Sequence, residues 1–427
     1  MFISCRDDGE TSADTDADTD TDPCTGVITF PDHSLEASIR MAINKPTGDI
    51  LSEDLAGLTV LNAGGNISNL ENIQCLGALT ELYLGFNQIS DISLLSSLNG
   101  LVKLDLGGNE ISDLSPLSNL TGLKELYLYF NQISDVGPLS NLTGLDDLDL
   151  AWNQISDLIG LRNLTSLTSL YLYSNQISDL SPLANLIGLT WLSLDSNSIS
   201  DLSPLGNLTG LKELYLYSNQ ISDISSLTNL TGLIRLSLEE NQISDLDPLS
   251  NLTGLKELHL NSNRISDLSP LSNMSGMTML YLDFNQISDV GPLSNMSGLL
   301  GLYLNSNQIS DVSPLGNMTS LTVLGLDTNQ ISDLGPLSNL IGLLGLHLSS
   351  NQISDLSPLR NLTDLMKLNL SSNQISNLRP LLDNSGLGDG DFVSVTGNPL
   401  NCDDAIMLQQ ISTLENRGVL LANDCTE

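Results

Sequence analysis

The sequence has few basic residues. Its 427 residues include 14 Lys and Arg against 51 Asp and Glu, so the formal net charge is −37 at pH 7. Phosphate backbones and anionic lipid surfaces would repel such a chain, so its charge argues against nucleic acid or an anionic membrane surface as a partner. A basic protein or a cation is the kind of partner that this charge favours.

Cysteine is absent from the long central part of the chain. The five cysteines, all near one end or the other, are Cys5, Cys24, Cys75, Cys402 and Cys425. Pairing Cys24 with Cys75 and Cys402 with Cys425 would close each end, and each bridge would contribute ~2–4 kcal/mol in an oxidising compartment. Cys5 is then left over. Either it carries lipid, because Ser4-Cys5 resembles the processing point of a bacterial lipoprotein signal, or it is a free or mispaired thiol.

A unit of 22 residues repeats along most of the chain, and residues 122–143 (GLKELYLYFNQISDVGPLSNLT) are one copy. Its asparagine recurs at this step at Asn87, Asn109, Asn131, Asn153, Asn175, Asn197, Asn219, Asn241, Asn263, Asn285, Asn307, Asn329, Asn351 and Asn373. Irregular copies stand at Asn66 and Asn398. A fixed period of this length predicts one solenoid of about 16 repeats instead of two or three globular domains. We expect the recurring asparagine to bond the backbone of adjacent coils.

The spacing of apolar residues predicts the shape of each coil. Leu126 and Leu128 are two residues apart, which places both on one face of a short strand. From Ile133 to Leu142 the apolar residues recur at steps of three, and this favours 3₁₀ or extended turns over an α-helix. Eleven of the 15 prolines share one position there. The prediction is an α/β, β-rich solenoid: a curved right-handed rod, roughly 75 Å long at about 4.8 Å per strand, with one parallel sheet on its concave face and turns on its convex face.

Both ends of the array differ from the repeats. Short helices are expected after Asp32 and at Ser52, and another is expected over 403–415, ended by Gly418. Their apolar stripes are Leu35, Ile39 and Ile43 at the first end and Ile406, Met407, Ile411 and Leu414 at the second. We assign 1–23 to a disordered acidic linker with a remnant lipoprotein signal, 24–57 to a helical N-terminal cap, 58–400 to the solenoid and 401–427 to a C-terminal cap.

The consensus LxxLxLxxNxISDLSPLxNLTG resembles the bacterial leucine-rich repeats of the internalin family, and the likeness extends from about Phe30 to Cys425. FPDHSLEASIRMAINKPTGDI is similar to the helical cap of those proteins. NPLNCDDAIMLQQ followed by LANDC is similar to a cysteine-bearing C-terminal cap. The resemblance implies a parallel-sheet solenoid whose concave face binds another macromolecule.

Catalytic chemistry finds little support in the sequence. His33, His259 and His347 are the three histidines, and the last two are four repeats apart. An open, solvated sheet is expected to offer its carboxylates no pocket that would shift their pKa values. We therefore predict neither enzymatic activity nor a cofactor.

Thirteen successive repeats, from Asp91 to Asp355, carry an aspartate after the Ile-Ser step. Calcium binding and capping of the following turn both fit this ladder. We favour capping, with no metal site, because the ladder supplies one carboxylate per repeat.

Aromatic residues make up 4% of the chain, and most fall at outward positions of the repeat strands. The predicted partner-binding residues are Tyr83, Phe86, Tyr127, Tyr129, Phe130, Trp152, Tyr171, Tyr173, Trp191, Tyr215 and Tyr217. The strand preference of tyrosine accounts for part of this set, but it accounts poorly for the two tryptophans. Tyr127, Trp152, Tyr171 and Trp191 are expected on four adjacent strands as one surface about 15 Å across.

Together these features predict an extracytoplasmic bacterial protein that acts as a monomer. We expect it to bind a protein with a basic and apolar surface through its concave aromatic and acidic face. No transmembrane segment is expected, and a lipid at Cys5 would be its anchor. A glycan-binding module and an envelope protein without a specific ligand are the alternatives.

Overall fold

The computed structural model describes residues 23–425. Seventeen parallel strands of three residues each form one sheet in chain order. They are β3 (Val60–Asn62), β4 (Glu81–Tyr83), β5 (Lys103–Asp105), β6 (Glu125–Tyr127), β7 (Asp147–Asp149), β8 (Ser169–Tyr171), β9 (Trp191–Ser193), β10 (Glu213–Tyr215), β11 (Arg235–Ser237), β12 (Glu257–His259), β13 (Met279–Tyr281), β14 (Gly301–Tyr303), β15 (Val323–Gly325), β16 (Gly345–His347), β17 (Lys367–Asn369), β18 (Phe392–Ser394) and β19 (Leu420–Ala422).

The return segments are short 3₁₀-helices, as the three-residue spacing predicts. They are η1 (Ile73–Cys75), η2 (Ser93–Ser97), η3 (Ser115–Leu117), η4 (Gly137–Asn141), η5 (Ile159–Leu161), η6 (Ser181–Leu183), η7 (Ser203–Leu205), η8 (Ser225–Asn229), η9 (Asp247–Leu249), η10 (Ser269–Leu271), η11 (Gly291–Asn295), η12 (Ser313–Leu315), η13 (Gly335–Asn339) and η14 (Ser357–Asn361).

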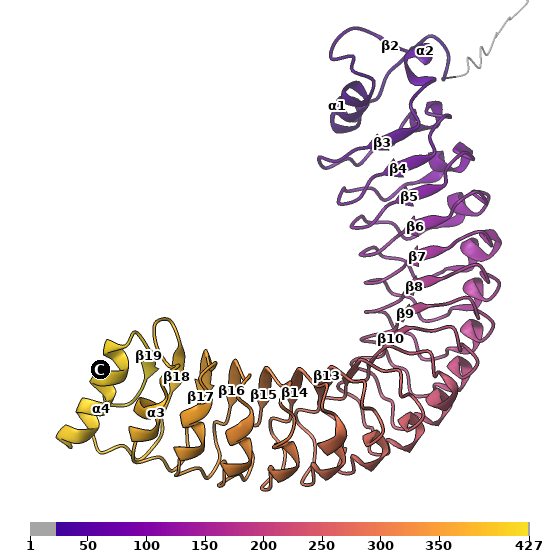
Figure 1. Cartoon of the computed structure of the whole chain (residues 1–427). Helices are drawn as coiled ribbons and strands as arrows, with labels where there is room; N and C mark the ends of the chain where they lie inside the picture. The colour runs from indigo at the N-terminus through magenta and orange to yellow at the C-terminus, as the bar shows by residue number, and fades with distance from the viewer. Residues whose placement is uncertain (1–22, 426–427) are drawn as a thin grey trace, which may run out of the picture.

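The sheet lines the inner side of a curved rod and the 3₁₀ turns line its outer side (Figure 1). This arrangement confirms the predicted solenoid. The rod bends around β10 to β13, and we call β3–β10 the N-terminal limb and β13–β19 the C-terminal limb. Because the limbs meet at an angle, their inner faces look toward a shared open space.

Identical register builds a continuous core. Leu126 pairs with Leu104 on one side and Leu148 on the other, and all three are fully buried. The core is made of leucine and isoleucine with few exceptions. Among the described buried residues Phe30, in the N-terminal cap, is the one aromatic side chain.

The repeated asparagine joins neighbouring coils as expected. Asn131 Nδ2 donates to the carbonyl oxygens of Leu106 (3.0 Å) and Leu128 (3.1 Å), and its Oδ1 accepts from the Ile111 N–H (2.9 Å). The same pattern extends to Asn398. Asn66 departs from it, because its side chain is exposed and its backbone is left-handed, with φ 67°.

The two ends are closed by caps. The first contains β1 (Val27–Ile28) antiparallel to β2 (Ile50–Leu51), with α1 (His33–Ala42) and α2 (Ser52–Leu55); the small sheet was not predicted. Asp32 caps α1 by accepting from the N–H groups of Ser34 and Leu35 (2.9 and 3.1 Å). At the other end lie α3 (Arg379–Asp383) and α4 (Ala405–Asn416). Met407, Ile411 and Leu414 of α4 are buried, whereas Ile406 is 65% exposed, so the prediction that Ile406 belongs to the buried stripe is wrong.

Disulfides hold both caps. Cys24 is bonded to Cys75 and Cys402 to Cys425, the pairing expected from the cysteine placement. Within 23–425 no helix is long and apolar enough to span a bilayer. The predicted lipid site at Cys5 and nearly all of the predicted linker 1–23 lie outside the described residues.

Candidate functional site

Four columns of side chains cover the concave face, because each coil repeats the last in register. In the N-terminal limb the first column holds Glu125, Asp147, Ser169, Trp191 and Glu213, and the second holds Tyr127, Asp149, Tyr171, Ser193 and Tyr215. The third column, two residues past each strand, holds Tyr129, Ala151, Tyr173, Asp195 and Tyr217. The turn column follows directly, with Phe130, Trp152, Ser174, Ser196 and Ser218.

The turn column corrects the prediction that all these aromatics stand on strands. Phe86, Phe130, Trp152 and Phe284 lie in left-handed turns with φ between 54° and 56°. Serine holds this position in most other repeats, so no backbone requirement calls for an aromatic residue there. The side chains of Phe86, Phe130 and Trp152 are 73, 60 and 53% exposed.

The aromatic rings form separate clusters. Trp152 lies between Phe130 and Tyr173, with ring centroids 6.2 and 6.4 Å away. Trp191 lies between Tyr171 and Tyr215, at 5.9 and 5.1 Å. Trp191 thus contacts Tyr171 as expected, whereas Trp152 stands in the turn column and contacts Tyr173 of the third column. That Tyr127, Trp152, Tyr171 and Trp191 act as one binding surface stays a prediction.

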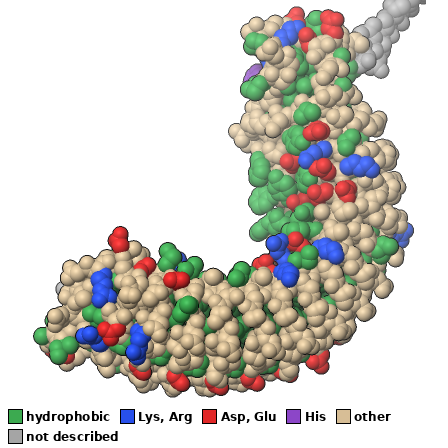
Figure 2. Space-filling view, in the orientation of Figure 1, with side chains coloured by type: hydrophobic (Ala, Val, Ile, Leu, Met, Phe, Trp, Pro, Cys, Tyr) green, Lys and Arg blue, Asp and Glu red, His purple; other side chains and the backbone are tan. Residues whose placement is uncertain are grey.

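Tyr83 and Tyr127 belong to a polar group near the start of the sheet. The Lys103 ammonium lies 5.7 and 5.3 Å from their ring centroids and 2.6 Å from a Glu125 carboxylate oxygen. The Tyr127 hydroxyl contacts both Glu125 (2.9 Å) and Asp147 (3.1 Å). Figure 2 shows hydrophobic side chains interleaved with acids on the inner face of the N-terminal limb.

Carboxylates among these rings are partly buried. Burial raises the pKa of Asp149 to about 6, and desolvation also raises the pKa values of Asp105, Asp147 and Asp195. The expectation that the open sheet would leave carboxylates unperturbed is therefore wrong, because neighbouring tyrosine and tryptophan rings exclude water. Asp147 Oδ1 and Trp191 Nε1 are buried without a hydrogen-bond partner among the described residues.

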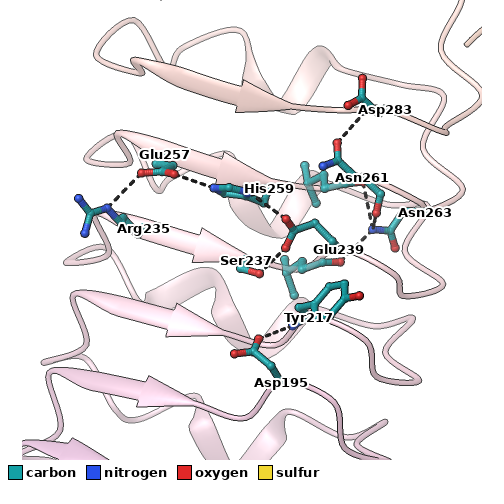
Figure 3. A network of polar contacts seen from close by, with 12 residues as sticks. Asp195, Tyr217, Arg235, Ser237, Glu239, Glu257, His259, Asn261, Asn263 and Asp283 are labelled. Atoms are coloured by element: carbon teal, nitrogen blue, oxygen red, sulfur yellow. Dashed lines mark hydrogen bonds and ion pairs between the residues drawn. The ribbon is translucent and has the colours of Figure 1, made fainter. Parts of the chain in front are cut away.

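At the bend, the second column changes character. His259 Nδ1 lies 2.9 Å from Glu239 Oε1 and its Nε2 lies 2.8 Å from Glu257 Oε1, and Arg235 bonds Glu257 (Figure 3). Arg235 also bonds Glu213. Carboxylates accept hydrogen bonds, so both contacts form as hydrogen bonds when both ring nitrogens carry protons, and the site therefore favours the imidazolium form of His259. Its ring stacks on Tyr281 at 4.2 Å. The three histidines do not meet, as expected, but this His259 cluster was not predicted.

The aspartate ladder caps turns. Asp91 Oδ1 accepts from the Ser93 N–H at 2.9 Å, and the same contact recurs through Asp355, whose Oδ1 accepts from the Ser357 N–H at 2.8 Å. Each N–H belongs to the first residue of a 3₁₀-helix. Over residues 23–425 no three His, Cys, Asp or Glu side chains are grouped so that they could hold a metal ion.

A family model described as leucine-rich repeats, in two copies, matches residues 77–119, 99–141, 143–185, 187–229, 231–273, 253–295 and 297–339. These stretches cover more than half of the chain. The chain therefore belongs to the leucine-rich repeat family.

Solved bacterial structures narrow this assignment. The internalin InlF of Listeria monocytogenes is 38% identical, with 82% of this chain and 96% of that one covered and a TM-score of 0.68. A leucine-rich repeat protein of Leptospira interrogans is 25% identical, with 87 and 97% covered and a TM-score of 0.78. The functional domain of InlJ of L. monocytogenes shares the fold at 24% identity, with 86 and 81% covered and a TM-score of 0.74. The chain is thus an internalin-like bacterial leucine-rich repeat protein. A search of curated proteins found no match.

Proposed function

We propose that this chain is an extracytoplasmic bacterial protein that binds another protein through the concave face of its N-terminal limb, without catalysis. The observation that carries the proposal is the exposure of Phe86, Phe130 and Trp152 at turn positions where serine suffices for the fold. Large exposed aromatics next to carboxylates provide the anchors and charge that protein interfaces use. Their excess in one limb supports a site there.

The charge of the chain supports a partner with basic and apolar surface. The net charge of −37 would speed the approach of a cationic protein, and the aromatic clusters would bind its apolar side chains. Internalin-like architecture accords with a protein partner as well.

The two disulfides support an oxidising compartment outside the cytoplasm. Lipidation of Cys5 is part of this proposal. Mass analysis of the protein taken from its native compartment should show Cys24–Cys75 and Cys402–Cys425 bridges with Cys5 lipidated or unpaired. Free thiols at all of these positions would contradict the assigned location.

The binding test compares substitutions at equivalent turn positions in the two limbs. Phe130→Ser and Trp152→Ser should fold normally, because Ser174 and Ser196 hold the same left-handed conformation. At least one should lose ~2 kcal/mol or more of affinity for a basic protein captured by the folded array. Phe284→Ser removes an aromatic residue with 62% exposure from the C-terminal limb and should change affinity by less than about 0.5 kcal/mol.

The alternatives give different results in the same experiment. Saturable binding of free saccharides that depends on Trp152 would establish the glycan-binding module instead. Unchanged affinity for an identified partner in Phe130→Ser and Trp152→Ser would contradict the proposed surface. If the chain is a structural envelope protein without a specific ligand, neither substitution should change the binding of any ligand.

A further inference from the structure

The second column contains a small residue between two large ones in the middle of the N-terminal limb. Tyr171, Ser193 and Tyr215 are consecutive partners across β8, β9 and β10. Neighbouring strands are about 4.8 Å apart, so the two tyrosines stand about 10 Å from each other with only a buried serine between them. The sheet is therefore hollowed above Ser193.

Trp191 closes one side of this hollow. Trp191 belongs to the first column, and its ring centroid lies 5.9 Å from that of Tyr171 and 5.1 Å from that of Tyr215. The space has a volume of about 340 Å³ and is lined by these three rings, Ser193, Tyr173 and two aspartates. A side chain from outside can therefore lie against aromatic surface on several sides.

Asp149 and Asp195 are the two acids of the hollow. Asp195 is held by the Tyr217 N–H (2.7 Å, Figure 3) and the Ser193 hydroxyl (2.9 Å), and Asp149 by the Ala151 N–H (2.9 Å). Among residues 23–425 neither aspartate has an ion pair, and two basic residues of this sheet are paired elsewhere, Lys103 with Glu125 and Arg235 with Glu213 and Glu257. Two half-buried carboxylates thus stand next to aromatic faces without a cation of their own.

We propose that this hollow binds one cationic side chain, a lysine ammonium or an arginine guanidinium, presented by the protein partner. The inference rests on the proposed function and adds the chemistry that the partner must bring. A cation over the Trp191 or tyrosine rings gains cation–π attraction. It also offsets the cost of burying Asp149 and Asp195, which an uncharged or acidic side chain cannot do.

The hollow can be tested with small probes on the full chain, before any partner is identified. N-acetyl-arginine amide and N-acetyl-lysine amide are titrated at physiological salt and followed by ligand-observed NMR. N-acetyl-citrulline amide is the uncharged counterpart of the arginine probe. We expect saturable binding of the two cations and at least about tenfold weaker binding of the citrulline probe.

Asp149→Asn and Asp195→Asn keep an oxygen for the backbone N–H groups and remove the charge. Each should weaken binding of the arginine probe about tenfold. Asp327→Asn is the charge-matched control, because Asp327 holds the same repeat position as Asp195 and accepts likewise from a backbone N–H, that of Ser349 (2.5 Å). Asp327→Asn should weaken binding of the arginine probe by less than about twofold.

Trp191→Ser removes one wall and places there the residue that Ser169 provides in the preceding repeat. This variant should lose the preference for cations over citrulline while keeping the thermal stability of the array. Equal binding of the arginine and citrulline probes by the unmodified chain would overturn the proposal. So would an effect of Asp327→Asn as large as that of Asp195→Asn, since binding would then follow net charge.

Failure of this inference is distinguishable from failure of the proposed function. If Phe130→Ser or Trp152→Ser weakens partner binding while the probes show no cation preference, the proposed binding surface is supported and the hollow is not its cation site. If the probes bind as expected but neither aromatic substitution affects a captured partner, the hollow stands and the wider surface is wrong.

Discussion

Each repeat asparagine bonds backbone groups of its own coil and of the preceding coil. Asn329, which is buried, bonds the carbonyl oxygens of Leu304 and Leu326 and the N–H of Ile309. An amide of this length provides one acceptor and two donors at one point. The Leu304 carbonyl oxygen also accepts from Asn307 (3.1 Å), so neighbouring asparagines share carbonyl oxygens, whereas the Ile309 N–H is bonded by Asn329.

We expect Asn329→Ala to destabilise the array by about 1–3 kcal/mol, because the buried Ile309 N–H loses its partner and two carbonyl oxygens keep only their bonds from the neighbouring asparagines. Urea denaturation followed by circular dichroism measures the change. Gln330→Ala, at the exposed neighbouring position, should stay within about 0.5 kcal/mol. Equal effects of the two substitutions would show that water replaces the asparagine amide.

The His259 cluster gives the array a pH-dependent element. Burial lowers the pKa of His259, but the hydrogen bonds that its ring donates to Glu239 and Glu257 outweigh burial, and the net pKa is raised above 6.5. A raised histidine pKa adds stability that is present below pH 6.5 and lost as pH rises through the folded pKa. The pKa of Glu239 is lowered despite its burial, owing to His259 and Ser237, so its contribution is lost as pH falls below its ordinary value of 4.5.

We therefore expect the cluster to stabilise the fold most between pH 4.5 and 6.5. His259→Gln should lose stability relative to the unmodified chain in this window, and the difference should shrink above the folded pKa. Thermal denaturation of both proteins across this range and into alkaline buffer measures the difference. The cluster is also faced by Arg235, Glu213 and Glu257. Arg235→Gln is the control, because it measures how much of the stability change comes from the ion pairs of Arg235. A pH-independent difference would contradict a charged His259.

At the scale of elements, adjacent 3₁₀-helices differ in how closely they approach one another. In η5, Gly160 stands where proline stands in many repeats, and an ideal Cβ there would lie 2.2 Å from the Val136 carbonyl oxygen just before η4. No real side chain fits at that distance. Glycine at this position therefore permits the close contact of η4 with η5.

Gly160→Ala should force these turns apart and cost about 1–3 kcal/mol. Chemical denaturation gives the magnitude, and hydrogen exchange should place the loss of protection in η4 and η5. Gly77→Ala is the control, because a Cβ at Gly77 meets no atom within 4 Å. If both variants are equally stable, the turns adjust without loss of packing.

The elements and their order could be predicted from the period, because a two-residue step defines the strand and three-residue steps define the turns. The second column was harder to interpret. Its alternation of Tyr127, Asp149, Tyr171, Ser193 and Tyr215 is visible once the repeats are aligned, and it is the signal that would have located the hollow. The aromatic residues of the turn column were predicted on strands. Their side-chain direction depends on the left-handed backbone conformation after each strand, which the apolar spacing does not reveal. Ring contacts and the raised pKa of Asp149 depend on how side chains pack, which spacing alone does not define.

For the whole molecule, charge repulsion is the property that solution conditions change most easily. With a net charge of −37, the rod should gain stability smoothly as sodium chloride is added to dilute buffer, since added ions screen the repulsion. Thermal denaturation over a salt series measures this. Calcium should add nothing beyond its ionic strength, because each ladder aspartate already caps a turn. A saturable rise in melting temperature at micromolar calcium, absent with sodium, would identify metal sites and contradict the capping role.

The uniform pairing register has a genetic consequence. Leu126 meets Leu148 as Leu148 meets Leu170, and Asn131 and Asn153 bond equivalent atoms on both sides. A recombination event that removes or duplicates 22 codons would therefore join coils across a seam like every other, with no backbone group left unpaired. Each such event would change the length of the rod by one strand spacing, about 4.8 Å, and shift the aromatic clusters relative to the bend. The gene can thus alter the reach of the concave face in fixed steps while the fold stays the same.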